Sequence, residues 1–156
     1  MNRNLTIAAR LREVLLDGTW IANTNFKMQL QDLNWLQATQ KVGSLNTIAM
    51  LTFHINYYLK GLLRAFEAGK LEISDQYSFD MPQINSANDW DELRAEFLHH
   101  AAQFVWKVEQ LEDDVFDQPF IDEKYGTWLR NIEGVIEHCY YHLGQISLIK
   151  KLIVGT

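Results

Sequence analysis

The chain has 156 residues, of which 47% are hydrophobic and 22% are charged, and its formal net charge is -6 at pH 7. A chain of this length and composition can bury one continuous apolar core, so we expect a single domain covering residues 1–156. Because the chain is acidic and has no run of Lys or Arg, it lacks the basic patch that phosphate binding requires. This excludes nucleic acid from the expected partners.

The cysteine content and the apolar segments indicate the compartment. Cys139 is the only cysteine, so no intrachain disulfide can form, as is usual in a reducing cytoplasm. Arg10 and Arg12 interrupt the first apolar segment before it resembles a secretory leader. The most apolar stretches, 47–53 and 146–154, are shorter than the roughly 20 residues that span a bilayer. We therefore expect a soluble, cytoplasmic protein without a membrane partner.

The first predicted helix ends near Gly18, a residue type that is common just after a helix C-terminus. Residues 19–42 are less regular, and within them Leu30, Leu33 and Leu36 indicate a short helix. We interpret this segment as a connector that packs on the core. The apolar side of the first helix consists of Leu5, Ala8, Leu11 and Leu15.

The second long helix is predicted to end at Gly69 and to begin at Ser44 or Asn46, both of which are good N-cap residues. His54 lies within it. Residues 70–85 carry Asp, Ser and Pro among aromatic residues, which predicts an ordered loop and not a flexible linker. The apolar side of this helix consists of Ile48, Leu51, Ile55, Leu59, Leu62, Leu63 and Phe66.

The two remaining predicted helices lie in the second half of the chain. The third, with Asn88 as its N-cap, has the clearest helical periodicity. The fourth runs from about Thr127 to Ile153, after a loop that contains Pro119 and Gly126. The apolar side of the third consists of Trp90, Leu93, Phe97, Ala101, Phe104, Val108 and Leu111. That of the fourth consists of Ile132, Ile136, Cys139, Leu143 and Ile146.

These elements define the expected fold class. Four main helices without strand alternation predict an all-α protein, a four-helix bundle with long ordered connections. Because the connections after the second and third helices are long, the sequence leaves the order and direction of the helices open.

Three of the five histidines occupy positions from which they can meet. His138 and His142 are four residues apart, which separates them by about 40° of helix rotation at the edge of the apolar side. His54 lies near the apolar side of the second helix. Neutral imidazoles bind transition metals, so the three can share one ion. Buried histidines that hydrogen-bond to each other explain the same positions, and both interpretations stay open here.

Other metal sites fit the sequence less well. A zincin needs Glu directly after the first histidine of such a pair, where this chain has Cys139. A di-iron bundle needs two Glu-x-x-His motifs, and only Glu96 with His99 supplies one. We expect His99 to face solvent and His100 to lie at the boundary of the core. Cys139 belongs to an apolar side, so we interpret it as a small buried residue and not as a nucleophile.

Segment 137–146, with its H-x-x-x-H-x-G-Q core, resembles the last helix of the DinB/YfiT-like metalloenzyme superfamily. Segment 46–55 resembles the second helix of that family, in which one histidine, here His54, is a ligand. Trp20, in a G-x-W context, resembles the exit from the family's first helix. The similarity covers most of the chain in element order and implies the family's four-helix bundle of DinB/YfiT-like type.

The resemblance also implies a metal site. It assigns His54, His138 and His142 as ligands of a divalent ion, zinc or nickel before iron or manganese, at one end of the bundle. Relatives include thiol-dependent S-transferases and a mycothiol-dependent isomerase. The implied function is a metal-dependent enzyme, a low-molecular-weight-thiol S-transferase or a hydrolase, that acts on a small molecule. The alternative is a non-enzymatic bundle with a structural or sensing metal site. A homodimer agrees with the resemblance, because related bundles often pair.

Three neutral ligands would leave a divalent ion with an open position for water or substrate. Gln145 follows His142 by three residues on the same helical face, and is the best candidate for a polar contact with a ligand or a cofactor. Trp20 is a second candidate as a pocket wall, with a core tryptophan as the alternative. The motif identifies no general acid or base. We expect most of the nearby tyrosines to pack: Tyr57, Tyr58, Tyr140 and Tyr141.

Overall fold

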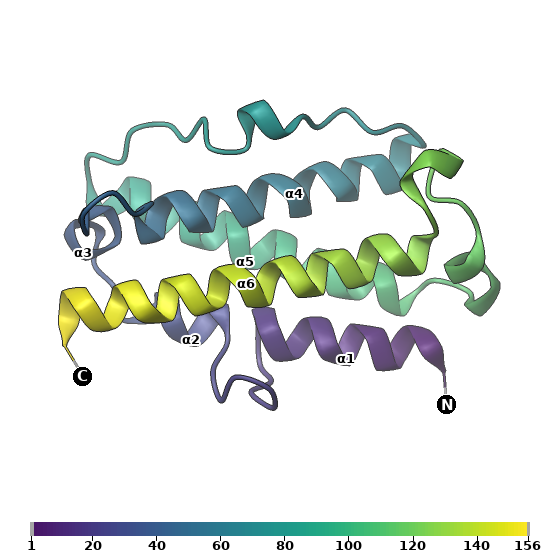
Figure 1. The fold of residues 1–156 in the computed structure, drawn as a ribbon, viewed down its shortest axis with the longest axis horizontal. Coiled ribbons are helices and arrows are strands. Elements are labelled where there is room, and N and C mark those ends of the chain that lie inside the picture. Colours follow the sequence, from purple (N-terminus) through teal and green to yellow (C-terminus); the bar gives the residue numbers. More distant parts are fainter. Residues whose placement is uncertain (1, 156) are drawn as a thin grey trace.

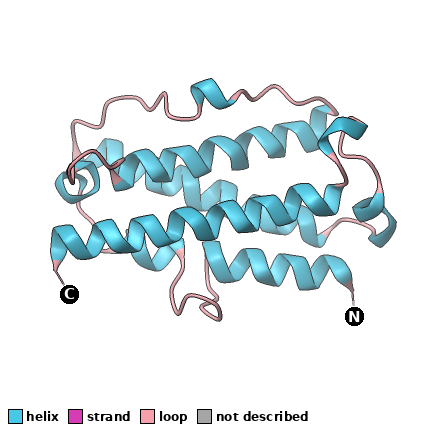
Figure 2. Cartoon of the chain, in the orientation of Figure 1, coloured by secondary structure: helices cyan, strands magenta, loops and turns pink. Residues whose placement is uncertain are grey.

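Helices joined by loops make up the computed structural model, which describes residues 2–155 (Figures 1 and 2). Within that range no strand forms beyond an isolated bridge between Pro119 and Thr127, so the all-α class is confirmed. The four long helices are α1 (Arg3–Leu15), α4 (Ile48–Ala68), α5 (Ala87–Glu109) and α6 (Trp128–Val154). The short elements are helices α2 (Phe26–Gln31) and α3 (Trp35–Thr39) and the 3₁₀ turns Asp75–Tyr77, Asp113–Asp117 and Glu123–Tyr125.

The direction of the long helices is what the sequence left open. Following the chain in Figure 1, α1 and α6 run one way while α4 and α5 run the other. Helix α4 packs against α5, α6 and α3, and α5 packs against α4, α1 and α3. Helix α4 lies antiparallel to α6. Because α4 and α5 are parallel, residues 69–86 must return along the full length of the bundle. We call these residues the crossing segment.

Two helix starts differ from those predicted. Thr47 caps α4 in place of Ser44 or Asn46, and Ser86 caps α5 in place of Asn88. In each case the hydroxyl oxygen accepts a hydrogen bond from the backbone N–H three residues later, which satisfies one of the free donors of the first turn. Asn88 already lies inside the helix. The predicted end of α4 is confirmed, since Gly69 closes this helix in the left-handed conformation with φ 67°.

The predicted apolar sides of the four long helices form the core, except that Leu5 of α1 is 52% exposed. Cys139 is 1% exposed within the core. The connector packs only in part. Phe26, Leu30 and Leu33 are buried, whereas Leu36 is 61% exposed and does not join them. For residues 2–155, no helix combines the length and the apolar character that crossing a membrane requires.

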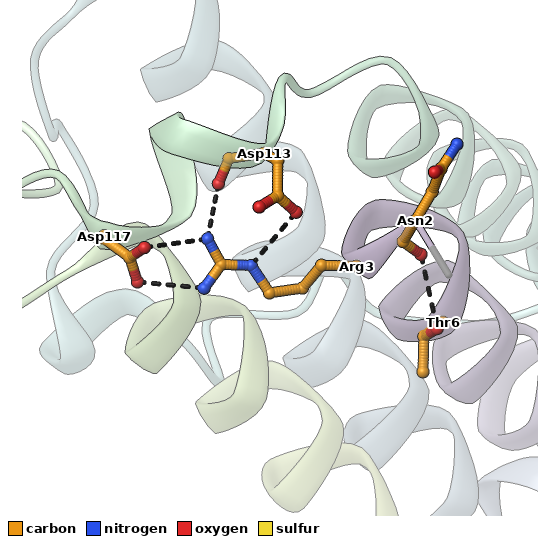
Figure 3. A network of polar contacts seen from close by, with 5 residues as sticks. All are labelled: Asn2, Arg3, Thr6, Asp113 and Asp117. Carbon is orange, nitrogen blue, oxygen red and sulfur yellow. Dashed lines mark hydrogen bonds and ion pairs between the residues drawn. The ribbon is translucent and has the colours of Figure 1, made fainter.

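A charged cluster ties the start of α1 to the loop after α5 (Figure 3). The Arg3 guanidinium donates to both carboxylate oxygens of Asp117, at 3.0 and 2.8 Å, and to a carboxylate oxygen of Asp113 at 3.3 Å. It also lies over the ring of Phe116, 5.2 Å from the ring centroid. Because Phe116 is buried, this contact places the loop against the core at the end of the bundle where α6 begins.

The crossing segment is held on α4 by shape and by hydrogen bonds. Gly61, in the middle of α4, leaves room for the side chain of Ile73. One turn earlier, the Tyr57 hydroxyl donates to the Ser74 carbonyl at 2.9 Å and accepts from the Ser74 N–H at 3.0 Å. The segment is therefore ordered, as its composition predicted.

Replacing Gly61 by alanine should loosen this contact. A Cβ at position 61 would overlap the Ile73 side chain, so the segment must shift, and we expect a loss of about 1–3 kcal/mol in the free energy of unfolding. Urea denaturation at 25 °C measures it. The matched control is Gly144→Ala in α6, where a Cβ would meet nothing within 4 Å and a gain of up to about 1 kcal/mol is expected. Equal effects of the two variants would contradict the assigned role of Gly61.

Candidate metal centre

His54 of α4 meets His138 and His142 of α6 between the two helices. The Nε2 atom of His138 lies 3.0 Å from Nε2 of His54 and 2.9 Å from Nε2 of His142. The three candidate ligand atoms all lie within 4.8 Å of one another. In a tetrahedral zinc site with Zn–N bonds of about 2.0–2.1 Å, neighbouring nitrogens are about 3.3 Å apart. The spacing of the imidazoles is thus close to that of ligands around one ion.

The outer nitrogens of two of these rings face hydrogen-bond acceptors. His54 Nδ1 lies 3.2 Å from the Ser78 carbonyl oxygen, and His142 Nδ1 lies 2.6 Å from Gln145 Oε1. Neither oxygen can donate, so both Nδ1 atoms carry the proton, and in the neutral rings both Nε2 atoms are bare. The hydrogen bonds therefore aim the lone pairs of His54 and His142 at the centre of the cluster.

This proton count tests whether a metal suits the site. Nε2 of His138 faces two bare nitrogens at about 3 Å and has at most one proton to give. At least one of the two close N···N approaches therefore has no proton between its atoms, which a buried hydrogen-bonded pair would avoid. A divalent cation accepts all three lone pairs at once. The donor set thus fits a metal ion better than it fits histidines that only pack.

Burial keeps these imidazoles neutral. His54 and His142 are each 6% exposed, and His138 is half-buried. Desolvation is the main cause that lowers the pKa of all three. For His138, desolvation and then the neighbouring His142 and His54 lower the pKa to about 4. Near pH 7 the cluster is therefore in the deprotonated form that binds a metal.

Aromatic side chains enclose one side of the cluster. The ring of Phe79 stacks on His54, with 4.1 Å between centroids, and the Tyr58 ring lies edge-on to both His54 and His138. The Tyr58 hydroxyl donates to Asp75 Oδ1 at 2.7 Å, and burial, followed by this bond, raises the pKa of Tyr58 to about 12. Tyr58 thus packs, as expected for most of the tyrosines, while its hydroxyl is held by the crossing segment.

Of the two residues proposed as cofactor contacts, one lies at the histidine cluster and the other is exposed in a loop. Gln145 bonds directly to His142, as its spacing indicated. Trp20 is 80% exposed in the loop between α1 and α2, so the alternative of a core tryptophan is wrong. That loop lies along the lower edge of Figure 1, whereas α4 runs along the upper side. A role of Trp20 as a pocket wall stays a prediction.

Three further predictions can be compared with the structure. The cluster is not at one end of the bundle, because His54 lies a third of the way along α4 and His142 halfway along α6. His99 is exposed and His100 is half-buried, as expected, with His100 Nδ1 2.7 Å from Asn56 Oδ1. Complete burial raises the pKa of the Cys139 thiol, which agrees with a packing role.

Sequence reasoning missed the contribution of the crossing segment. Ser78 orients His54 through its carbonyl oxygen, a group that every residue type carries, so no residue pattern could have indicated it. Phe79 and Asp75 lie more than 20 residues from His54 in the chain, and only the reading of 70–85 as an ordered loop pointed toward them. The segment supplies one acceptor, one stacked ring and one carboxylate to the surroundings of the histidines.

Gln145→Leu tests the orienting hydrogen bond on His142. Leucine has a similar size but accepts no hydrogen bond, so the ring loses the partner that fixes its tautomer. We expect metal affinity to fall about 10- to 100-fold, the usual cost of losing such a partner. Competition with a chromophoric chelator measures the change, and Gln145→Glu, which retains the acceptor oxygen, is the control. An unchanged affinity in the leucine variant would show that Gln145 does not orient the ligand.

Comparison with known proteins adds one positive finding. The model of the family described as DinB superfamily matches residues 23–146, a span that contains all three histidines and Gln145. Neither the curated proteins nor the solved structures contain a match to this chain.

Proposed function

This chain belongs to the DinB superfamily, and we propose that within it the chain is a divalent-metal-dependent enzyme that acts on a small molecule. In this proposal His54, His138 and His142 hold one ion, zinc or nickel in preference to iron or manganese. The reaction is thiol transfer from a low-molecular-weight thiol, or hydrolysis. The observation that carries the proposal is that Nε2 of His138 lies within 3.0 Å of Nε2 of His54 and of His142, while the outer nitrogens of those two rings donate to fixed acceptors.

The residues around the histidines suit a reactive site. When bound, such an ion lowers the pKa of water to about 7 and deprotonates a coordinating thiol, which provides a nucleophile at neutral pH. The Ser78 carbonyl and Gln145 hold two imidazoles in one orientation, and Phe79 covers the face of His54. Three ligands from the chain leave a position free in a four-coordinate site, as in catalytic zinc centres.

The alternative is a structural or sensing metal site without turnover. The apolar core favours catalysis over a structural role, because the four long helices already bury a continuous set of side chains on both sides of the cluster. A bundle with such a core does not need a metal in order to fold. We therefore propose that the protein stays folded without the ion and that the main effect of the ion is on chemistry.

Elemental analysis of protein purified without a histidine tag tests the metal part of this proposal. We expect about one divalent ion per chain. Thiol-conjugation assays of the same sample, with a panel of low-molecular-weight thiols and small electrophiles, then test the activity, with chelator-treated protein as the control. Protein that contains no metal and cannot be loaded with zinc or nickel contradicts the whole proposal. A loaded protein that neither conjugates these thiols nor hydrolyses these electrophiles favours the structural or sensing alternative.

A further inference from the structure

We propose that the substrate reaches the histidines through the cavity beside His138 and Tyr58, and that this cavity selects elongated molecules with an apolar body and an anionic end. This inference rests on the proposed function, because it names the class of molecule on which the same site would act. The cavity itself has a volume of about 450 Å³, which is sufficient for a small organic molecule. We call it the His138 cavity.

A second cavity is lined by Gln145, which hydrogen-bonds to His142, so the choice between the two cavities matters. This cavity, of about 360 Å³, lies beside Leu51, Leu148 and Gln145 and reaches none of the three histidines. Gln145 stands between it and His142, with its side-chain oxygen bonded to the ring. The His138 cavity is bordered directly by a ring whose Nε2 faces the centre of the cluster. Of these two cavities, only the His138 cavity brings a reactant to one of the three histidines.

The walls of the His138 cavity determine which molecules can enter. Its polar residues lie in two places. Asp75 and Tyr58 are at the end near His138. Arg130 and Asn131 lie about two turns earlier on α6, and Tyr125 is beside them, since its carbonyl oxygen accepts a hydrogen bond from Asn131. Side chains between them are apolar and would cover the body of a ligand. These apolar residues are Leu62, Leu71, Ile73, Phe120 and Val135.

The two ends of the His138 cavity carry charged residues of opposite sign. Arg130 precedes His138 by eight residues, which places it about 12 Å away along the axis of α6. The Asp75 carboxylate lies at the histidine end, where it would repel an anionic group. A ligand anion therefore lies toward Arg130, whose planar guanidinium suits carboxylate, sulfonate or phosphate oxygens. The present partner of Arg130 is Glu137 at 3.1 Å, and both side chains are 61% exposed, so this weak surface pair yields readily to a ligand.

Gly134 keeps the middle of the cavity open. It lies in α6 between Arg130 and His138, and a Cβ built there would meet nothing within 4 Å. A larger side chain at position 134 would thus project into the cavity without disturbing the core. Gly144 offers a matched control, because it lies in the same helix, has the same open surroundings and borders neither cavity.

The test uses two fluorescent probes of nearly the same shape. 8-Anilinonaphthalene-1-sulfonate has an apolar body and an anionic group, and N-phenyl-1-naphthylamine lacks the anionic group. Probe binding is titrated with the protein as purified, and the metal content of each sample is measured in parallel. We expect Gly134→Leu to weaken binding of both probes at least about tenfold, and Gly144→Leu to leave it unchanged. We expect Arg130→Gln to weaken only the sulfonate, by about three- to fivefold.

Each outcome bears on one part of the inference. Unchanged binding in Gly134→Leu, or equal losses in the Gly144→Leu control, would overturn the assignment of the cavity. Equal effects of Arg130→Gln on the two probes would overturn the anionic selectivity. If Gly134→Leu does not fold, Gly134→Met fills the same space with a more adaptable side chain. Because the readout is fluorescence, a protein that cannot be loaded with zinc or nickel and still shows these effects would refute the proposed function and leave the cavity assignment intact.

Discussion

Replacing His138 by alanine is expected to abolish metal binding while the helices stay folded. His138 contributes the central nitrogen, since its Nε2 lies within 3.0 Å of the Nε2 atoms of both other histidines. Two imidazoles from different helices would remain, and the affinity should fall by more than the 10- to 100-fold that loss of an outer hydrogen-bond partner costs. His54→Ala and His142→Ala should behave in the same way.

The measurement is metal content per chain after dialysis, together with competition against a chromophoric chelator. His99→Ala is the matched control, because it removes an exposed imidazole from α5 and should leave metal content unchanged. Thermal unfolding of wild type with and without added ion gives an independent readout, since a ligand that binds only the folded state raises the melting temperature. Wild-type metal content in His138→Ala would refute the three-histidine site.

Replacing Trp90 by alanine is expected to cost the most stability of any change considered, about 3–5 kcal/mol in the free energy of unfolding. The indole is 1% exposed, and its Nε1–H donates to the Leu33 carbonyl at 2.8 Å. Alanine would leave a large cavity and a buried carbonyl without its partner. Because Leu33 belongs to the loop between α2 and α3, the variant would also loosen this connector from the start of α5.

Urea denaturation at 25 °C, with the midpoint and slope compared between variants, measures this loss. Trp106→Ala makes the same substitution in the same helix at a side chain that is 58% exposed, and we expect a change within about 0.5 kcal/mol. Trp90→Phe keeps most of the packing, loses the hydrogen bond and should fall between the two. Similar losses in Trp90→Ala and Trp106→Ala would show that the contact with Leu33 does not anchor the connector.

The sequence was sufficient for the parts of this protein that depend on periodicity. Apolar residues at three- and four-residue spacing predicted four long helices, because each helix must bury one side. The same spacing placed His138 and His142 one turn apart at the edge of such a side. The N-caps were less predictable, since Thr47, Ser44 and Asn46 are all suitable residues and tertiary packing decides where the extended backbone ends.

Features that depend on pairing between distant segments could not be predicted. The directions of the helices depend on the paths of the loops that join them, and the composition of a loop does not determine its path. The hydrogen bond from His54 ends on a backbone carbonyl, which no residue type marks. Trp20 is a different case: its residue type indicated that it would pack, and the side chain is exposed. Hydrophobic character alone does not determine the burial of a residue in an irregular loop.

The parallel arrangement of α4 and α5 has a consequence for how such a bundle can diversify. Antiparallel neighbours joined by a tight turn would leave the flank of α4 beside His54 bare, whereas the long return path lays Ser78 and Phe79 there. The helices that carry the imidazoles and the crossing segment that borders them are thus separate parts of the chain. Two proteins with the same four helices and different crossing segments would offer the same ligands to different molecules.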